Sequence, residues 1–130
     1  MSWIENWVSY KTKAQREREA AEYNAKVFPY GIPQRDAVFS ILDTLIKGRD
    51  RQMVTYNYLV IKEKLMKEDL ELDGEKIDEI RKSLKNTFSG SNDDFYLYIA
   101  LARADLKVDK ELRYPSIEDL KKSASILKQI

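Results

Sequence analysis

The chain has 130 residues, of which 43% are hydrophobic and 35% are charged, a composition typical of one globular domain with a highly charged surface. Lysine and arginine total 23 and aspartate and glutamate total 22, so the net charge of +1 provides no overall basic field for nucleic acid or anionic lipid. The absence of cysteine and histidine excludes disulfides, thiolate catalysis and the commonest general base and transition-metal ligand.

The sequence carries no targeting or membrane-spanning signal. No apolar run approaches the roughly 18 residues of a transmembrane helix, and the N-terminus lacks a basic start followed by an apolar stretch. Because cysteine is also absent, we expect a cytoplasmic protein. We find no repeat or internal linker, and we predict that residues 1–130 form a single helical domain.

The first expected helix runs from about Ser2 to Lys26 without a breaker. Its first turns are aromatic, whereas Ala14 is the only apolar residue between Lys11 and Glu19, so we expect this middle part to be solvated. At about 1.5 Å per residue the helix would be roughly 36 Å long, about the width of such a domain. We therefore predict a long N-terminal helix that overhangs its own bundle or lies across a second chain.

The next two expected helices span about 34–47 and 51–68. Gly48 ends the first of them. The second contains Met53–Ile61, which is rich in the Val, Thr, Tyr and Ile typical of strands. Apolar residues at helical spacing and the lack of a breaker favour a helix there, which is our prediction, with a strand as the alternative.

Three further helices complete the prediction. One spans about 75–88, and the next follows an N-cap at 91–93 and is apolar on almost every side over 95–104, which predicts a central helix. Ser116 begins the last helix. The predicted fold is all-α, a compact bundle of about six helices.

No catalytic constellation is present. Tyr58 and Lys62 have the Tyr-x-x-x-Lys spacing of some dehydrogenases, but the glycine-rich loop that would cradle a dinucleotide is missing. Ser125 and Lys128 have a nucleophile–base spacing, but nothing around them would desolvate the lysine. We predict that the chain is not an enzyme and that it has no catalytic residues and no cofactor.

An acidic turn matches the first half of a calcium loop. Asp69, Glu71 and Asp73 stand at ligand positions and Gly74 at the turn position, but Ile80 replaces the bidentate glutamate. We expect no metal site, and no calcium binding tighter than about millimolar.

A second acidic turn is Ala104-Asp-Leu-Lys-Val-Asp-Lys-Glu111. It resembles the short Ala-Asp-x-x-Val-x-x-Glu turns of tellurite-resistance TerB-like helical domains, although it lacks the glycine usual there. The resemblance is confined to this turn, and we take no function from it.

Two groups of residues are candidate binding sites. Trp3, Trp7 and Tyr10 are spaced one turn apart, and such residues are enriched in binding hot spots. They either pack on the bundle or bind a partner, and Glu5 argues against a membrane-surface helix.

The second candidate site is a basic group that comprises Lys11, Lys13, Arg16, Arg18, Lys47, Arg49 and Arg51. Carboxylates are interleaved with these residues in the sequence, which disfavours phosphate binding.

Our leading hypothesis is a non-enzymatic helical interaction module, a regulator, adaptor or small assembly subunit that binds a protein partner or a second copy of itself as a homodimer. One alternative is a nucleic-acid-associated regulator that uses the basic group. The other is a small-molecule or divalent-metal binder lined by carboxylates and tyrosines.

Overall fold

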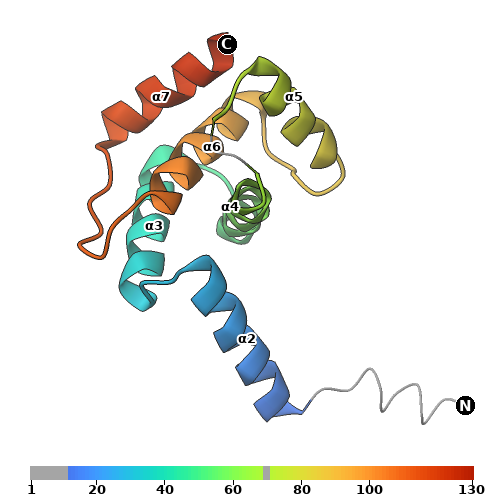
Figure 1. The fold of residues 1–130 in the computed structure, drawn as a ribbon, viewed down its shortest axis with the longest axis vertical. Coiled ribbons are helices and arrows are strands. Elements are labelled where there is room, and N and C mark those ends of the chain that lie inside the picture. The colour runs from blue at the N-terminus through green and yellow to red at the C-terminus, as the bar shows by residue number, and fades with distance from the viewer. Residues whose placement is uncertain (1–11, 69–70) are drawn as a thin grey trace, which may run out of the picture.

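The computed structural model describes residues 12–68 and 71–130, and these form six helices and no strand (Figure 1). The helices are α2 (Lys13–Val27), α3 (Ile32–Leu45), α4 (Arg51–Met66), α5 (Gly74–Ser83), α6 (Asn92–Leu106) and α7 (Ile117–Gln129). The predicted all-α fold is confirmed, and Met53–Ile61 is helical. None of the described helices is long and apolar enough to cross a membrane.

Side-chain caps set where most helices begin. Asp50, Asp73, Ser91 and Ser116 each accept a hydrogen bond from the backbone N–H three residues further on. The predicted caps of the last two helices are therefore confirmed. Gly48 follows the end of α3 with φ +77°, a left-handed conformation that glycine adopts without strain.

The central helix is α6, as predicted. It packs against α4 on one side and α7 on the other (Figure 1). Eight of its 15 residues are buried, including Ile99 and Leu101 with no exposed surface. Leu97 is only partly buried against the core. Because α6 is apolar around most of its circumference, it must be covered by neighbours on several sides.

The described N-terminal helix is shorter than predicted. Thr12 has an extended backbone (φ −65°, ψ 160°), and its hydroxyl accepts a hydrogen bond from the N–H of Gln15 in a capping box. An unbroken helix from Ser2 to Lys26 is therefore a wrong prediction, because the extended backbone of this threonine marks the start of α2. Trp3, Trp7, Tyr10 and Lys11 lie outside the described residues.

Helix α2 projects away from the bundle (Figure 1). Every residue from Thr12 to Glu22 is exposed, Tyr23 is half-buried, and Val27 is the buried residue of the helix. The charged middle of this segment is solvated, as predicted. We call α2 the arm.

Candidate docking surface and its buried anchor

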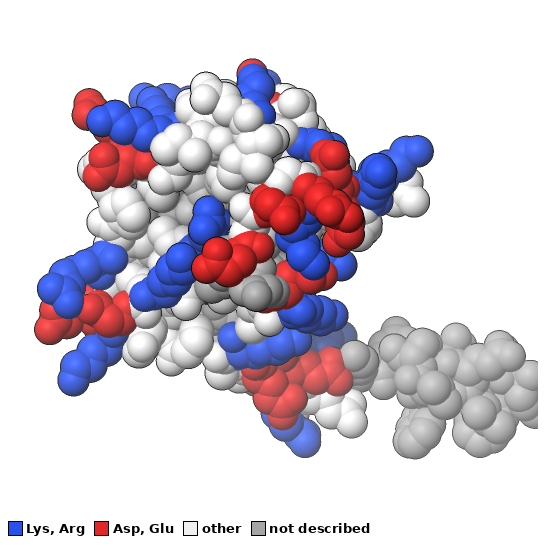
Figure 2. Space-filling view, turned by 45° about the horizontal axis from the view of Figure 1, so that its top comes forward, with Lys and Arg blue, Asp and Glu red and all other residues white. Residues whose placement is uncertain are grey.

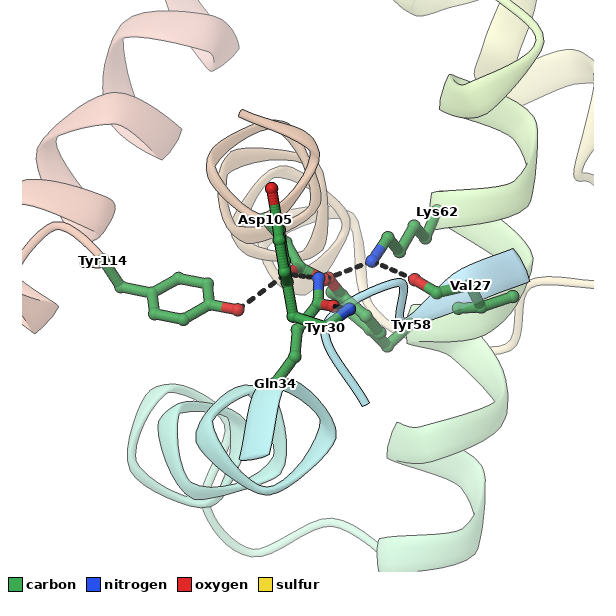
Figure 3. Close-up of polar contacts among 7 residues, drawn as sticks. All are labelled: Val27, Tyr30, Gln34, Tyr58, Lys62, Asp105 and Tyr114. Carbon is green, nitrogen blue, oxygen red and sulfur yellow. Dashed lines mark hydrogen bonds and ion pairs between the residues drawn. The ribbon is translucent and has the colours of Figure 1, made fainter. Parts of the chain in front are cut away.

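A buried carboxylate lies where the arm meets the bundle. Asp105, near the end of α6, accepts hydrogen bonds at Oδ1 from Gln34 Nε2 (2.9 Å) and the Tyr114 hydroxyl (2.7 Å) (Figure 3). Its Oδ2 accepts from the Tyr58 hydroxyl and from Lys62 Nζ, both at 2.5 Å. The Asp105 side chain has no exposed surface, and four donors satisfy its acceptor capacity. We call these five residues the hub.

The hub holds the arm through Lys62. The same ammonium group donates to the carbonyl oxygen of Val27, the last residue of α2 (Figure 3). It also lies 4.7 Å from the centre of the Phe28 ring. A cation is favourable there, because the carbonyls at a helix C-terminus carry partial negative charge. Gln34 Oε1 accepts from the Tyr30 N–H at 2.8 Å, which fixes the turn between α2 and α3.

Burial shifts the ionisation of the hub. It lowers the pKa of Lys62, and the neighbouring Asp105 carboxylate partly opposes this. Burial, followed by the charge and hydrogen bond of Asp105, raises the pKa of Tyr58 and of Tyr114. Both phenols therefore stay protonated as donors over the physiological range. With the acceptor capacity of Asp105 used internally, the hub has the character of a structural network.

Two grooves adjoin the arm and meet at one residue. One, of about 250 Å³, lies between α2 and the start of α3 and is lined by Ala21, Ala25 and Ile32. The other, of about 450 Å³, lies between α3 and α4 and includes Tyr56. Arg35 lines both grooves, so they form one continuous surface.

Large apolar side chains are exposed on this surface. Ile32 is 69% exposed and Tyr56 is 51% exposed. Phe39 lines the α3–α4 groove and packs edge-on against Phe28, with ring centres 6.0 Å apart, while the Arg35 guanidinium lies 5.4 Å from the Phe39 ring centre. No carboxylate lines either groove among the described residues. We call Ala21, Ala25, Ile32, Arg35, Phe39, Arg51 and Tyr56 the groove surface.

The structure does not gather the predicted basic group into one patch. Lys13, Arg16 and Arg18 lie on the exposed arm, whereas Lys47, Arg49 and Arg51 follow the C-terminal end of α3. Three of the described members are near carboxylates: Lys13 to Glu17 at 4.0 Å, Arg49 to Asp94 at 3.3 Å and Arg51 to Asp43 at 3.9 Å. Lys47 is exposed. Arg51 lines the α3–α4 groove. Figure 2 shows positive and negative side chains interleaved on the face it presents.

The acidic turn before α5 serves the fold. Asp73 caps α5, and Ile77 and Ile80, at two of the ligand positions of a calcium loop, are buried in the core. Among the described residues no group of three or more acidic side chains is placed to hold a metal ion, and Asp69 lies outside them.

The hub is the feature that sequence reasoning missed. Tyr58 and Lys62 were recognised only as a spacing, and Asp105 only as part of a turn, yet all three meet. Two features of the sequence could have indicated it. Gln34 stands beside the apolar stripe of α3, and Lys62 stands within the most apolar part of α4. Ser125 and Lys128 are unrelated to it, since Lys128 pairs with Asp93 on α6.

Comparison with known proteins found no relative of this chain. No family model, curated protein or solved structure matches it. Its function is therefore inferred from its own residues.

Proposed function

We propose that this chain is a non-enzymatic interaction module, acting in the cytoplasm, that docks a protein partner on the groove surface. The observation that carries the proposal is the exposure of Ile32 and Tyr56 along two grooves that meet at Arg35. Apolar side chains in a concave surface lose unfavourable contact with water when a partner covers them. Arginine and tyrosine are also the residue types enriched in binding hot spots.

The lining of the grooves selects the chemistry of the partner. Arg35 and Arg51 place two cations beside the apolar side chains, and no described carboxylate lines the grooves themselves. Asp43, 3.9 Å from Arg51, offsets part of the charge of that arginine. A segment that inserts apolar side chains and presents carboxylates next to them complements this surface. We therefore propose a partner segment that is apolar and acidic.

The arm suits a binding element because it is already helical. An isolated helix of 15 residues is marginal in water. Here the Thr12 capping box secures the first turn, and Lys62 secures the last through the Val27 carbonyl. A partner that contacts the arm does not have to order it, which lowers the entropic cost of binding.

Self-association through the N-terminal aromatic residues stays a prediction. Sedimentation of the wild type beside Trp3→Ala/Trp7→Ala, with thermal stability in parallel, tests it. Association that is lost while the monomer keeps its stability supports a homodimer or partner patch. A monomeric wild type whose double variant unfolds shows that the tryptophans belong to the core.

Site-specific photo-crosslinking tests the groove surface. A benzophenone side chain replaces Tyr56 in one protein and, as the control, Ile126 of α7, which is 63% exposed, in another. In native extract we expect a discrete protein adduct at position 56 that is absent at position 126. Excess unlabelled wild type should suppress it, whereas excess Ile32→Asp/Tyr56→Asp should not.

Three outcomes of this experiment contradict the proposal. The same adducts at both positions mean that the surface is merely exposed. A double variant that competes as well as the wild type means that the two side chains contribute nothing. An adduct that nuclease digestion removes identifies a nucleic acid as the partner, in agreement with the alternative hypothesis.

A further inference from the structure

A cavity of about 380 Å³ lies between the end of α5 and the start of α6, away from the groove surface. This volume falls within the range of small-molecule sites. Its apolar lining comes from Leu84, Phe88 and Phe95, and its polar lining includes three cations on or just after α5. We propose that this cavity binds a small organic anion with an aromatic or aliphatic body.

Ring packing fixes the apolar side of the cavity. Phe88 meets Phe95 edge-on, with ring centres 5.5 Å apart at 72°, and meets Tyr98 in the same way at 5.5 Å and 84°. Phe88 also covers Gly90, where an added Cβ would lie 2.6 Å from its Cζ atom. The aromatic wall therefore depends on a glycine and is set before any ligand arrives.

The charged side of the cavity is Arg81, Lys82 and Lys85, and no described carboxylate lines the cavity. Lys82 and Lys85 have no carboxylate partner among the described residues. Arg81 donates to Asp78 at 2.7 Å, which offsets part of its charge, and its buried Nε has no acceptor in the described chain.

The nearest acidic residues of α6 do not neutralise the cations of the cavity, because other basic side chains pair with them. Asp93 and Asp94, in the first turn of α6, pair with Lys128 and Arg49. The guanidinium carbon of Arg81 lies 5.2 Å from the Phe95 ring centre, which holds this cation against the aromatic wall. A ligand that pairs an anionic group with an apolar body matches both sides, whereas an inorganic anion or a neutral hydrocarbon matches only one.

Binding of 1-naphthalenesulfonate, followed by NMR of the full chain, tests the proposal. We expect saturable shifts confined to residues around the cavity, together with much weaker binding of sulfate and of the neutral 1-naphthalenemethanol. Lys82→Gln/Lys85→Gln should weaken sulfonate binding about tenfold, the equivalent of about 1.4 kcal/mol. Lys107→Gln/Lys110→Gln removes the same charge beyond the opposite end of α6 and should leave binding unchanged.

Gly90→Ala tests the apolar side with the charges intact. Its methyl group should displace the Phe88 ring and weaken binding of the sulfonate, with the ring displacement visible in the aromatic signals. Equal loss in the two lysine variants would overturn the proposal, because only net charge would then matter. Sulfate or the neutral alcohol binding as tightly as the sulfonate would overturn it too, as would shifts outside the cavity.

Discussion

Helices α2 and α6 have the same length, 15 residues each, and opposite environments. Eight residues of α6 are buried, whereas in α2 only Val27 is. Burial of apolar surface stabilises α6 along its whole length. The arm has no such support, and its stability comes from the Thr12 capping box at one end and Lys62 at the other. Loss of a contact in α6 should therefore lower the free energy of unfolding of the whole domain. Loss of a contact in the arm should destabilise the arm alone.

The largest effect is expected at the hub, in which Lys62 of α4 links the end of α2 to Asp105 of α6. Asp105→Ala leaves the Lys62 ammonium buried without a counter-charge, which should lower the free energy of unfolding by about 3–5 kcal/mol. Asp109→Ala is the control, because this carboxylate is exposed and pairs with Arg113 at the surface. In urea denaturation this variant should lose much less stability than Asp105→Ala, because an exposed ion pair contributes little to stability. Equal losses would show that the hub does not hold the bundle together.

The core of α6 comes next. Leu101→Ala should cost about 2–5 kcal/mol, because the residue is fully buried and its removal leaves a cavity. Leu97→Ala should cost less, since Leu97 is only partly buried, and exposed Ile126→Ala should cost under about 0.5 kcal/mol. Urea denaturation ranks the three variants. A loss under about 0.5 kcal/mol at both leucines would place α6 at the surface.

The hub should also make stability depend on pH. Unfolded tyrosines lose their protons near pH ~10. Burial and Asp105 raise the pKa of Tyr58, so the native state binds more protons above that pH, and stability falls as the pH rises. Lys62 acts in the opposite sense: burial lowers its pKa, so stability rises between that lowered pKa and the ordinary value of about 10.5.

Replacing one phenol isolates its part of this dependence. Tyr58→Phe should make the loss of stability above pH ~10 shallower by up to about 1.4 kcal/mol per pH unit. Urea unfolding at several alkaline pH values measures the slope, and exposed Tyr56→Phe controls for removal of a phenol. Slopes that coincide for wild type and Tyr58→Phe would show that the buried phenol titrates normally.

The smallest effect compares two helix caps. Ser91→Ala and Thr12→Ala each remove a side-chain hydrogen bond to a helix N-terminus, worth about 1 kcal/mol. Because Ser91 caps α6, its loss should lower the global free energy of unfolding. The loss at Thr12 should leave that value unchanged and speed hydrogen exchange in the first turns of α2. Equal global losses would mean that the arm unfolds together with the bundle.

Much of the fold follows from local features of the sequence. The apolar run of 95–104 predicts a central helix, because a helix without a polar face has to be covered. Caps at Ser91 and Ser116 mark helix starts because their side chains satisfy backbone donors nearby. Thr12 carries the same kind of signal, and its capping box makes the described N-terminal helix shorter than the apolar pattern alone predicts.

The sequence by itself determined the helical class, the central helix and the solvated arm, since composition and periodicity over a few turns decide whether a helix is buried. The tertiary structure alone decided the hub. Asp105 meets Gln34, 71 residues away, and Tyr58, 47 residues away. The grooves that meet at Arg35 likewise exist only because α2, α3 and α4 pack at one corner. Contacts over such separations depend on how the helices pack, and a local sequence pattern does not indicate how helices far apart in the chain pack together.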